Sequence, residues 1–260
     1  MTPDTSYFEV RIATAPSDLL AAQRLRYRVF VEELGGDGAL VDHDNRFERD
    51  EFDAVVDHLI LIDKRRSVDS LDHVVGVYRL LPGDRAKTFG RFYCDSEYDL
   101  TPLRNTGRSV LELGRSCVDP AYRGGSGLFL LWSGLAEYVL GHDIDLLFGV
   151  ASFHGTDAQA LAQPLSWLHH HHLAPEALRA TALPQGFQRM DLIPAENLDR
   201  REAMKQMPAL IKAYLRLGGS IGQGAYLDHA FNTTDVFLLV DTKAMSQKHR
   251  DFYSARNASA

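Results

Sequence analysis

The chain has 260 residues, of which 45% are hydrophobic and 24% are charged, a composition typical of a globular protein with a sizeable core. Its formal net charge of -7 argues against a nucleic-acid-binding protein, which would usually be basic. With only Cys94 and Cys117 and no secretion signal at the start, we expect a cytoplasmic protein without disulfides. The longest nearly apolar window, residues 128–140, is too short for a transmembrane helix, although peripheral membrane contact stays open.

Periodicity predicts the elements of the first half of the chain. Residues 7–13 alternate in polarity and predict a strand, and a helix follows from Pro16 to about Leu34, where two glycines end it. The apolar segments 57–63 and 74–81 flank a polar run and predict a hairpin.

The second half begins with a strand, helix and strand unit. The elements expected here are a strand at 110–118, a helix at 128–140, a strand at 146–152, helices at about 156–170 and 198–217, and a strand at 235–240. No repeat or linker divides the chain, so we expect one domain over residues 1–260 with a helical C-terminal elaboration at about 155–220. The order predicts a mixed central sheet flanked by helices, of the α/β or α+β class, and it resembles the acyl-CoA N-acetyltransferase (GNAT) fold.

Two charged residues interrupt the strand at 110–118. Glu112 and Arg115 stand where apolar residues would be comfortable, and charges in a buried strand are costly unless they are paired. Residues three apart in a strand face opposite sides of the sheet unless a bulge intervenes. The segment therefore predicts a site, with a bulge between the two charges.

Other charged residues lie at the ends of predicted elements. Arg26 and Phe30 are one turn apart on the first helix, so that a cation and an aromatic ring project together. Arg79 lies towards the end of a strand, and Asp53 and Asp57 supply acidic groups. The alternative is a set of scattered surface ion pairs, which would contribute little.

A glycine-rich segment precedes the helix at 128–140. Free backbone N–H groups at a helix start, aided by the helix dipole, bind anions such as a pantetheine phosphate. The alternative is a flexible turn. The residues concerned are Arg123, Gly124, Gly125 and Gly127.

Two further patterns stay open. The run His169–His172 places adjacent side chains in different directions on a helix, which disfavours a metal site and favours a helix end or a polar lining. The helix at 198–217 is basic in an acidic chain, which suits an acidic carrier protein, anionic lipid headgroups or simply solvent. Its basic residues are Arg200, Arg201, Lys205, Lys212 and Arg216.

Together these segments resemble the bacterial ornithine N-acyltransferase family of ornithine-lipid synthesis. The strand segment reads Leu-Glu-Leu-Gly-Arg-Ser-Cys-Val, and the matching segments, which run through nearly the whole chain, are 25–30, 52–53, 57–59, 78–81, 111–118, 131–132, 151–153, 168–175, 211–218 and 228–236. The resemblance implies transfer of a 3-hydroxyacyl chain from acyl carrier protein to the α-amine of L-ornithine, giving lyso-ornithine lipid. It also implies no permanently bound cofactor, because the donor is the acyl-phosphopantetheine of the carrier, and contact with the inner membrane would be peripheral.

The first half of the chain also resembles acyl-homoserine-lactone synthases. Such an enzyme, or another N-acyl amino acid synthase, is the second reading, and a non-catalytic module that binds acyl carrier or lipid is the third. The acidic segment departs from the lactone-synthase spacing, because Asp57 lies four rather than three residues beyond Asp53. Ser126 and Leu128 depart from the phosphate loop of acetyltransferases, which weakens the case for the pyrophosphate of coenzyme A and is compatible with acyl carrier protein as the donor.

The mechanism expected from this resemblance needs a base and an oxyanion hole. Glu112 is the candidate base, acting directly or through a water, and the proposed catalytic set is completed by Arg115 and Asp53. Substrate-binding residues are expected to be Arg26, Phe30, Arg79, Asp57, Asp228 and Asp235, the last two as guesses for the δ-ammonium of ornithine. The oxyanion and phosphopantetheine would contact Ser116, Cys117, Val118, Arg123, Gly124, Gly125 and Gly127. No metal is expected, and Cys117 is expected to pack rather than to act as a nucleophile.

Overall fold

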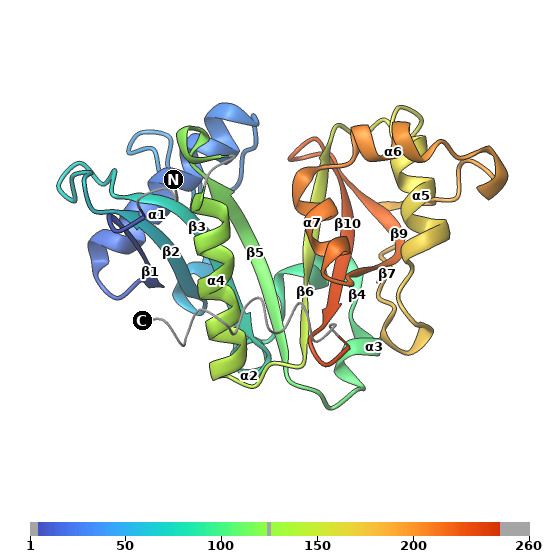
Figure 1. The fold of residues 1–260 in the computed structure, drawn as a ribbon, viewed down its shortest axis with the longest axis horizontal. Coiled ribbons are helices and arrows are strands. Elements are labelled where there is room, and N and C mark those ends of the chain that lie inside the picture. The colour runs from blue at the N-terminus through green and yellow to red at the C-terminus, as the bar shows by residue number, and fades with distance from the viewer. Residues whose placement is uncertain (1–4, 124–125, 245–260) are drawn as a thin grey trace. The chain divides into compact units, whose positions relative to one another are not determined.

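The computed structural model describes residues 5–123 and 126–244, which form two compact units (Figure 1). Unit 1 holds residues 5–89 and the described part of 113–143, and unit 2 holds residues 90–112 and 144–244. Strand β5 (Val110–Val118) contributes its first residues to unit 2 and the rest to unit 1. Strands of both orientations with helices packed on them confirm the predicted mixed α/β class.

Unit 1 is built on the strand order β1-β2-β3-β5, in which β1, β2 and β3 are antiparallel. Besides β5, its strands are β1 (Phe8–Ile12), β2 (Asp57–Asp63) and β3 (Val74–Pro82). Its helices are α1 (Pro16–Arg26), the π-helix η1 (Tyr27–Glu33), the short turns η2 (Glu51–Ala54) and η4 (Pro120–Tyr122), α2 (Gly83–Phe89) and α4 (Ser126–Gly141). The predicted first strand and hairpin are confirmed. The predicted first helix is α1, and η1 continues it as a π-helix to Glu33.

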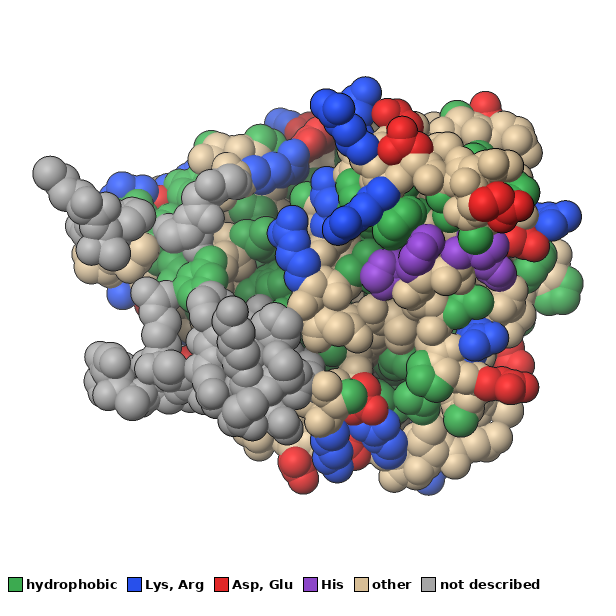
Figure 2. Space-filling model, turned by 45° about the vertical axis from the view of Figure 1, so that its right-hand side comes forward, with side chains coloured by type: hydrophobic (Ala, Val, Ile, Leu, Met, Phe, Trp, Pro, Cys, Tyr) green, Lys and Arg blue, Asp and Glu red, His purple; other side chains and the backbone are tan. Residues whose placement is uncertain are grey.

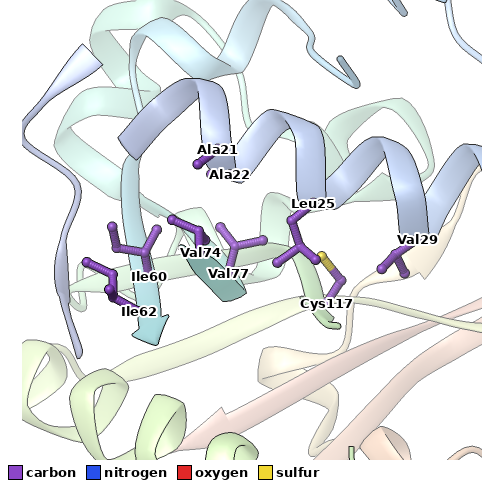
Figure 3. Packing of buried hydrophobic residues seen from close by; sticks show 9 residues of the cluster. All are labelled: Ala21, Ala22, Leu25, Val29, Ile60, Ile62, Val74, Val77 and Cys117. Carbon is purple, nitrogen blue, oxygen red and sulfur yellow. The ribbon is translucent and has the colours of Figure 1, made fainter. Parts of the chain in front are cut away.

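Two helices cover opposite faces of the unit 1 sheet because side chains alternate along β2. Ile60 and Ile62 pack with α1 in a core cluster (Figure 3). Leu59 and Leu61 come close to α4, where Cβ atoms built on its glycines would lie within about 3.3 Å of them. The whole of β2 beyond its first residue is therefore buried, which explains the apolar run at 59–62.

Unit 2 is built on the strand order β5-β6-β10-β9-β7-β4, with β8 paired to β9. Its strands besides β5 are β4 (Tyr98–Asp99), β6 (Leu146–His154), β7 (Thr181–Ala182), β8 (Phe187–Gln188), β9 (Ser220–Asp228) and β10 (Thr233–Asp241). Its helices are α3 (Thr101–Arg104), α5 (Ala162–His172), α6 (Arg200–Gln206) and α7 (Ala209–Arg216), with the turns η3 (Tyr93–Ser96), η5 (Glu176–Leu178) and η6 (Ala195–Asn197).

The core of unit 2 is aromatic. Phe148 of β6 and Phe237 of β10 stack with ring centroids 5.6 Å apart. Phe92 contacts the first ring edge-on at 5.1 Å, and Tyr98 contacts the second at 5.3 Å. Such ring contacts add to the large apolar area that each side chain buries. They join β6 and β10, which pair antiparallel, to the segment that precedes β5.

Two predicted helices differ from the structure. The helix expected at 198–217 is two helices, because Pro208 has no N–H to continue α6 and Met207 before it is extended, with ψ 129°. Helix α5 begins at Ala162 rather than near residue 156, since the Asp157 side chain accepts hydrogen bonds from the backbone of Gln159 and Ala160 and forms a turn.

Strand β9 was not predicted from the sequence. Gly222 and Gly224 interrupt its pattern, and both are required by close neighbours. A Cβ on Gly222 would lie 2.6 Å from the Ala180 carbonyl oxygen, and Gly224 has φ +75° with the ring of Phe187 against it. In the part of the chain that the structure describes, no helix combines the length and the apolar character needed to cross a bilayer.

Candidate functional site

Arg26 is the centre of a buried ionic network in unit 1. Its side chain is fully buried, and its guanidinium donates to Glu48 Oε2 at 2.5 Å and to both oxygens of Asp53 at 2.7 and 2.8 Å. It also donates to the backbone oxygen of Glu48 at 2.6 Å. This two-sided fork fixes the acidic segment against the end of α1.

Two more arginines close the network from neighbouring strands. Arg79 of β3 donates to Asp50 Oδ1 at 2.5 Å and to Asp53 Oδ1 at 3.1 Å. Arg115 of β5 donates to Glu48 Oε1 at 3.0 Å and to Asp50 Oδ2 at 3.3 Å. Arg26 and Arg79 therefore meet at Asp53. Arg115 joins them through Glu48 and Asp50, two carboxylates that sequence reasoning missed.

The missed residues, Glu48 and Asp50, had a signal in the sequence. Acidic residues recur at 48, 50 and 53, just before the strand at 57–63. Burial alone would raise the pKa of the Glu48 carboxyl, but Arg26 and Arg115 outweigh it and lower the pKa. Burial is likewise outweighed by Arg79 at Asp50 and by Arg26 at Asp53, so both carboxyls also have lowered pKa values.

Local backbone geometry positions Arg115 and Phe30. Arg115 has φ +47°, a left-handed conformation that is rare for a residue with a side chain, which agrees with the bulge expected in this strand. Phe30 lies in the π-helix η1, and its ring centroid is 6.0 Å from the Arg115 guanidinium. The cation and the aromatic ring thus meet, and a role for either in binding substrate stays a prediction.

Asp57 does not join the network. It accepts hydrogen bonds from Arg85 at 2.7 Å and from the Tyr138 hydroxyl at 2.7 Å, which links β2 to α4. Its neighbour His58 is buried and donates from Nε2 to the Asp53 backbone oxygen at 3.2 Å. Burial lowers the pKa of His58. His58 therefore contacts the acidic segment, whereas Asp57 is used to join β2 to other elements.

Glu112 lies in unit 2, where it is 3% exposed. Its carboxylate accepts hydrogen bonds from the backbone N–H groups of Tyr93 at 2.8 Å and Cys94 at 2.7 Å. These bonds orient the carboxylate and hold the start of the turn η3. Each carboxylate oxygen has two lone-pair directions, so two N–H bonds leave it capacity to accept a proton or a further bond.

A second acidic cluster in unit 2 joins three carboxylates from distant parts of the chain. Glu97, Asp228 and Asp235 each offer an oxygen, and these oxygens all lie within 4.8 Å of one another. Glu97 and Asp235 are buried, and Asp228 is half-buried. Negative groups this close favour a cation between them, either an ammonium or a metal ion. Sequence reasoning named the two aspartates but missed Glu97.

The segment after Arg115 lies in unit 1. Cys117 and Val118 are buried, and Ser116 is half-buried. The Cys117 thiol packs with Leu25 and Val29 in the cluster of Figure 3, and burial raises its pKa to about 12. A packed, protonated thiol is a poor nucleophile, as expected from the sequence. An oxyanion role for the backbone N–H groups here stays a prediction.

The expected phosphopantetheine segment is described only in part, because Gly124 and Gly125 lie outside the described residues. Arg123 is exposed and pairs with Glu33 at 2.5 Å while donating to the Val118 carbonyl at 2.9 Å. Gly127 is buried, and a Cβ there would lie 3.2 Å from Leu61, so it allows close packing of α4.

The histidine run forms the end of α5. His170 bonds to the backbone oxygen of Ile193 at 3.1 Å. His171 bonds to the backbone oxygen of Trp167 at 3.0 Å and stacks on its ring. These contacts fit the end of a helix, one of the readings that the sequence left open.

Known proteins resemble the chain over most of its length. An L-ornithine N(alpha)-acyltransferase of Rhodobacter capsulatus is 64% identical over 249 residues, which cover 96% of this chain and 95% of that protein. Those of Agrobacterium fabrum and Brucella abortus are 42% and 41% identical, over 94% and 95% of this chain and 84% and 89% of their own lengths. The chain belongs to the L-ornithine N(alpha)-acyltransferase family. It is therefore an acyltransferase, as expected from the sequence.

The domain and fold agree with this family. The family model described as Acetyltransferase (GNAT) domain matches residues 25–133, which include the whole ionic network of unit 1. A CoA-dependent acyl-homoserine lactone synthase solved with MTA aligns over 96% of this chain and 90% of its own, with a TM-score of 0.54 and 15% identity. An N-acyl amino acid synthase from uncultured soil microbes aligns over 94% and 97%, with a TM-score of 0.55 and 14% identity. At these identities the likeness shows the GNAT-like fold alone.

Proposed function

We propose that this acyltransferase moves a 3-hydroxyacyl chain from acyl carrier protein to the α-amine of L-ornithine and so forms lyso-ornithine lipid. Ornithine is proposed as the acceptor because the chain is 64% identical, over nearly its whole length, to an enzyme named for ornithine and its α-nitrogen. The carrier-bound donor is supported by Ser126 and Leu128, which depart from the usual phosphate loop of coenzyme A enzymes.

The reaction needs a neutral amine. The α-ammonium of ornithine loses a proton, and its nitrogen attacks the thioester carbonyl carbon to give a tetrahedral oxyanion. As the C–S bond breaks, the attacking nitrogen loses its second proton and the departing thiolate takes up that proton, which leaves an amide and a free thiol. We assign the first proton to Glu112, which its bonds to Tyr93 and Cys94 hold in one orientation.

The acceptor's second amine distinguishes ornithine from most amino acids. We assign its δ-ammonium to the acidic cluster of Glu97, Asp228 and Asp235, whose oxygens converge within 4.8 Å. A charge-assisted bond to such a cluster is stronger than a bond between neutral groups, and a neutral side chain would leave the carboxylates poorly matched. Arg26 and Arg79 are buried and bond to carboxylates of the chain itself, so we assign them to positioning the acidic segment.

The function is tested by lipid mass spectrometry of a host that lacks ornithine lipids and expresses this chain. We expect an N-(3-hydroxyacyl)ornithine. The purified protein should then form the same product from ornithine and acyl carrier protein loaded with a 3-hydroxyacyl group, faster than from the matching acyl-CoA. A different amino acid in the product, or an acyl-homoserine lactone in the medium, would replace the proposed acceptor. Faster turnover with acyl-CoA would contradict the donor.

A further inference from the structure

Helices α6 and α7 carry a concentration of positive charge. Residues 199–216 contain 5 basic and 2 acidic residues, in a chain whose net charge is -7. The two helices follow one another with only Met207 and Pro208 between them. Opposite net charge in one short segment marks a surface for an anionic partner.

The cations of this segment are largely available. Arg200, Arg201 and Arg216 are exposed and make no ion pair with any residue in 5–123 or 126–244. Lys205 lies 3.9 Å from Glu202, and its side chain is 77% exposed. The acidic Asp199 is used elsewhere, since its carboxylate accepts the backbone N–H of Arg201 and caps α6. The segment therefore presents charge that the described protein does not neutralise.

Aliphatic side chains accompany these cations. Ile211 and Tyr214 are buried and anchor α7, while Met204, Leu210 and Leu215 remain partly exposed. Helix α5, which ends in His169–His172, packs against α6, and Figure 2 shows a row of histidines with basic and hydrophobic side chains around it. Exposed cations beside partly exposed aliphatic groups are what an amphipathic helix presents to a lipid headgroup layer.

We infer that α6 and α7 bind the anionic surface of a lipid bilayer. The inference rests on the proposed function, because a product with a fatty chain must pass from the enzyme into a bilayer. Each basic side chain near an anionic leaflet strengthens binding, and the partly exposed aliphatic groups can enter the headgroup region. An acidic carrier protein would use the same cations, but the aliphatic groups between them favour lipid.

The test is sedimentation of the full chain with sucrose-loaded vesicles of phosphatidylcholine, with or without about a third phosphatidylglycerol, in the absence of substrates. We expect binding only to the anionic vesicles. The variant Arg200→Glu/Arg201→Glu/Arg216→Glu should bind at least about 10-fold more weakly, since each cation contributes several-fold. The matched control Arg46→Glu/Lys64→Glu/Lys87→Glu makes the same change of charge at exposed sites in unit 1 and should bind within about 3-fold of the unchanged protein.

Several results would overturn the inference: no vesicle binding, equal binding to both vesicles, or equal loss in the two variants. A triple arginine variant that keeps vesicle binding but loses transfer from soluble acyl carrier protein would assign the face to the carrier instead. Because sedimentation needs no substrate, a protein that acylates ornithine but does not bind vesicles refutes only this inference. One that binds vesicles but makes no ornithine product refutes only the proposed function. Circular dichroism verifies that each variant is folded.

Discussion

At the scale of single residues, the chemistry depends on charges that the fold has taken out of water. Arg26 is fully buried, yet it has two carboxylate partners and a backbone oxygen, so its desolvation is offset by bonds of good geometry. Removing one member of such a set leaves another charge buried and poorly matched. A substitution therefore lowers the free energy of unfolding by more than the net contribution of the single bond that it deletes.

Replacement of Arg26 tests this network. Arg26→Lys keeps the charge but loses the fork, so Glu48 and Asp53 cannot both be satisfied, and the free energy of unfolding should fall by about 3 kcal/mol. Arg189→Lys is the matched control, because Arg189 makes a similar fork to Asp191 with a 66% exposed side chain, and it should cost under about 1 kcal/mol. Urea unfolding measures both. Equal losses would show that burial of the network is not what matters.

Glu112 and Cys117 lie five residues apart in β5. Substitutions at the two positions distinguish general-base catalysis from nucleophilic catalysis. Glu112→Gln should lower kcat at least about 100-fold and remove the acidic limb of its pH profile, because an amide cannot accept the proton. Cys117→Ala should keep turnover within about 10-fold, since the thiol only packs. Steady-state kinetics of both variants, measured as a function of pH, test these expectations. If Glu112→Gln lowers the melting temperature but leaves the pH profile unchanged, Glu112 is a positioning residue and not the base.

The acidic cluster predicts how the acceptor is selected. Asp228→Asn keeps the acceptor oxygen that caps the turn to Ala230 but removes a charge, so KM for ornithine should rise at least about 10-fold. Norvaline, which has the same carbon chain without the δ-amine, should be a poor substrate whose kinetics the substitution leaves unchanged. Equal effects on the two amino acids would place the δ-ammonium elsewhere.

At the scale of elements, packing distances decide which residues a helix can carry. Helix α4 lies so close to β1 that a Cβ on Gly134 would be 2.3 Å from Val10 Cγ1. Gly141 is the last residue of the same helix, and no atom of the described residues lies within 4 Å of a Cβ built on it. The sequence alone does not separate these two glycines, because both interrupt the same apolar helix.

Alanine substitutions test this contact. Gly134→Ala should destabilise the protein by about 1–3 kcal/mol, because valine at position 10 is stiff and cannot move aside. Gly141→Ala should be neutral or stabilise by up to about 1 kcal/mol through its helix propensity. Adding Val10→Ala to Gly134→Ala should recover part of the loss measured by thermal unfolding. A loss that the second substitution leaves unchanged would place the strain elsewhere.

At the scale of the whole molecule, buried groups whose pKa values are lowered make the free energy of unfolding depend on pH in two steps. Burial lowers the folded pKa of His58, so its contribution is complete above the unfolded pKa of about 6.5 and is lost as the pH falls through the folded pKa. The carboxyls of Glu48, Asp50 and Asp53 have lowered folded pKa values despite their burial, because the arginines outweigh it. Their contribution is complete above about pH 4.3 and is lost below it.

Melting temperatures measured from pH 8 to pH 3 should therefore show a decline below about pH 6.5 and a steeper one below about pH 4. His58→Gln can still donate to the Asp53 backbone oxygen but cannot take up a proton, so it should flatten the first decline. His170→Gln changes an exposed histidine and serves as the control. If both variants flatten the curve equally, or neither does, the first decline has another origin.

Local sequence patterns by themselves determine much of the secondary structure of this protein. The hairpin of β2 and β3, strand β5 with its two charges, the helix after it and the final strand all follow from periodicity over neighbouring residues. Arg26, Arg79, Arg115 and Asp53 stood out because charges at the ends of buried elements need partners. The family resemblance also rested on ordered motifs alone.

Only the tertiary structure decided which residues meet. Glu48 and Asp50 belong to the network, whereas Asp57 bonds to Arg85 and Tyr138 instead. The reason is that buried partners distant in sequence set the path of the loop before β2. The glycines of strand β9 allow other segments to approach its backbone, and Glu97 lies beside two aspartates that are distant in sequence. Periodicity reports on neighbours along the chain, whereas these contacts depend on distances across it.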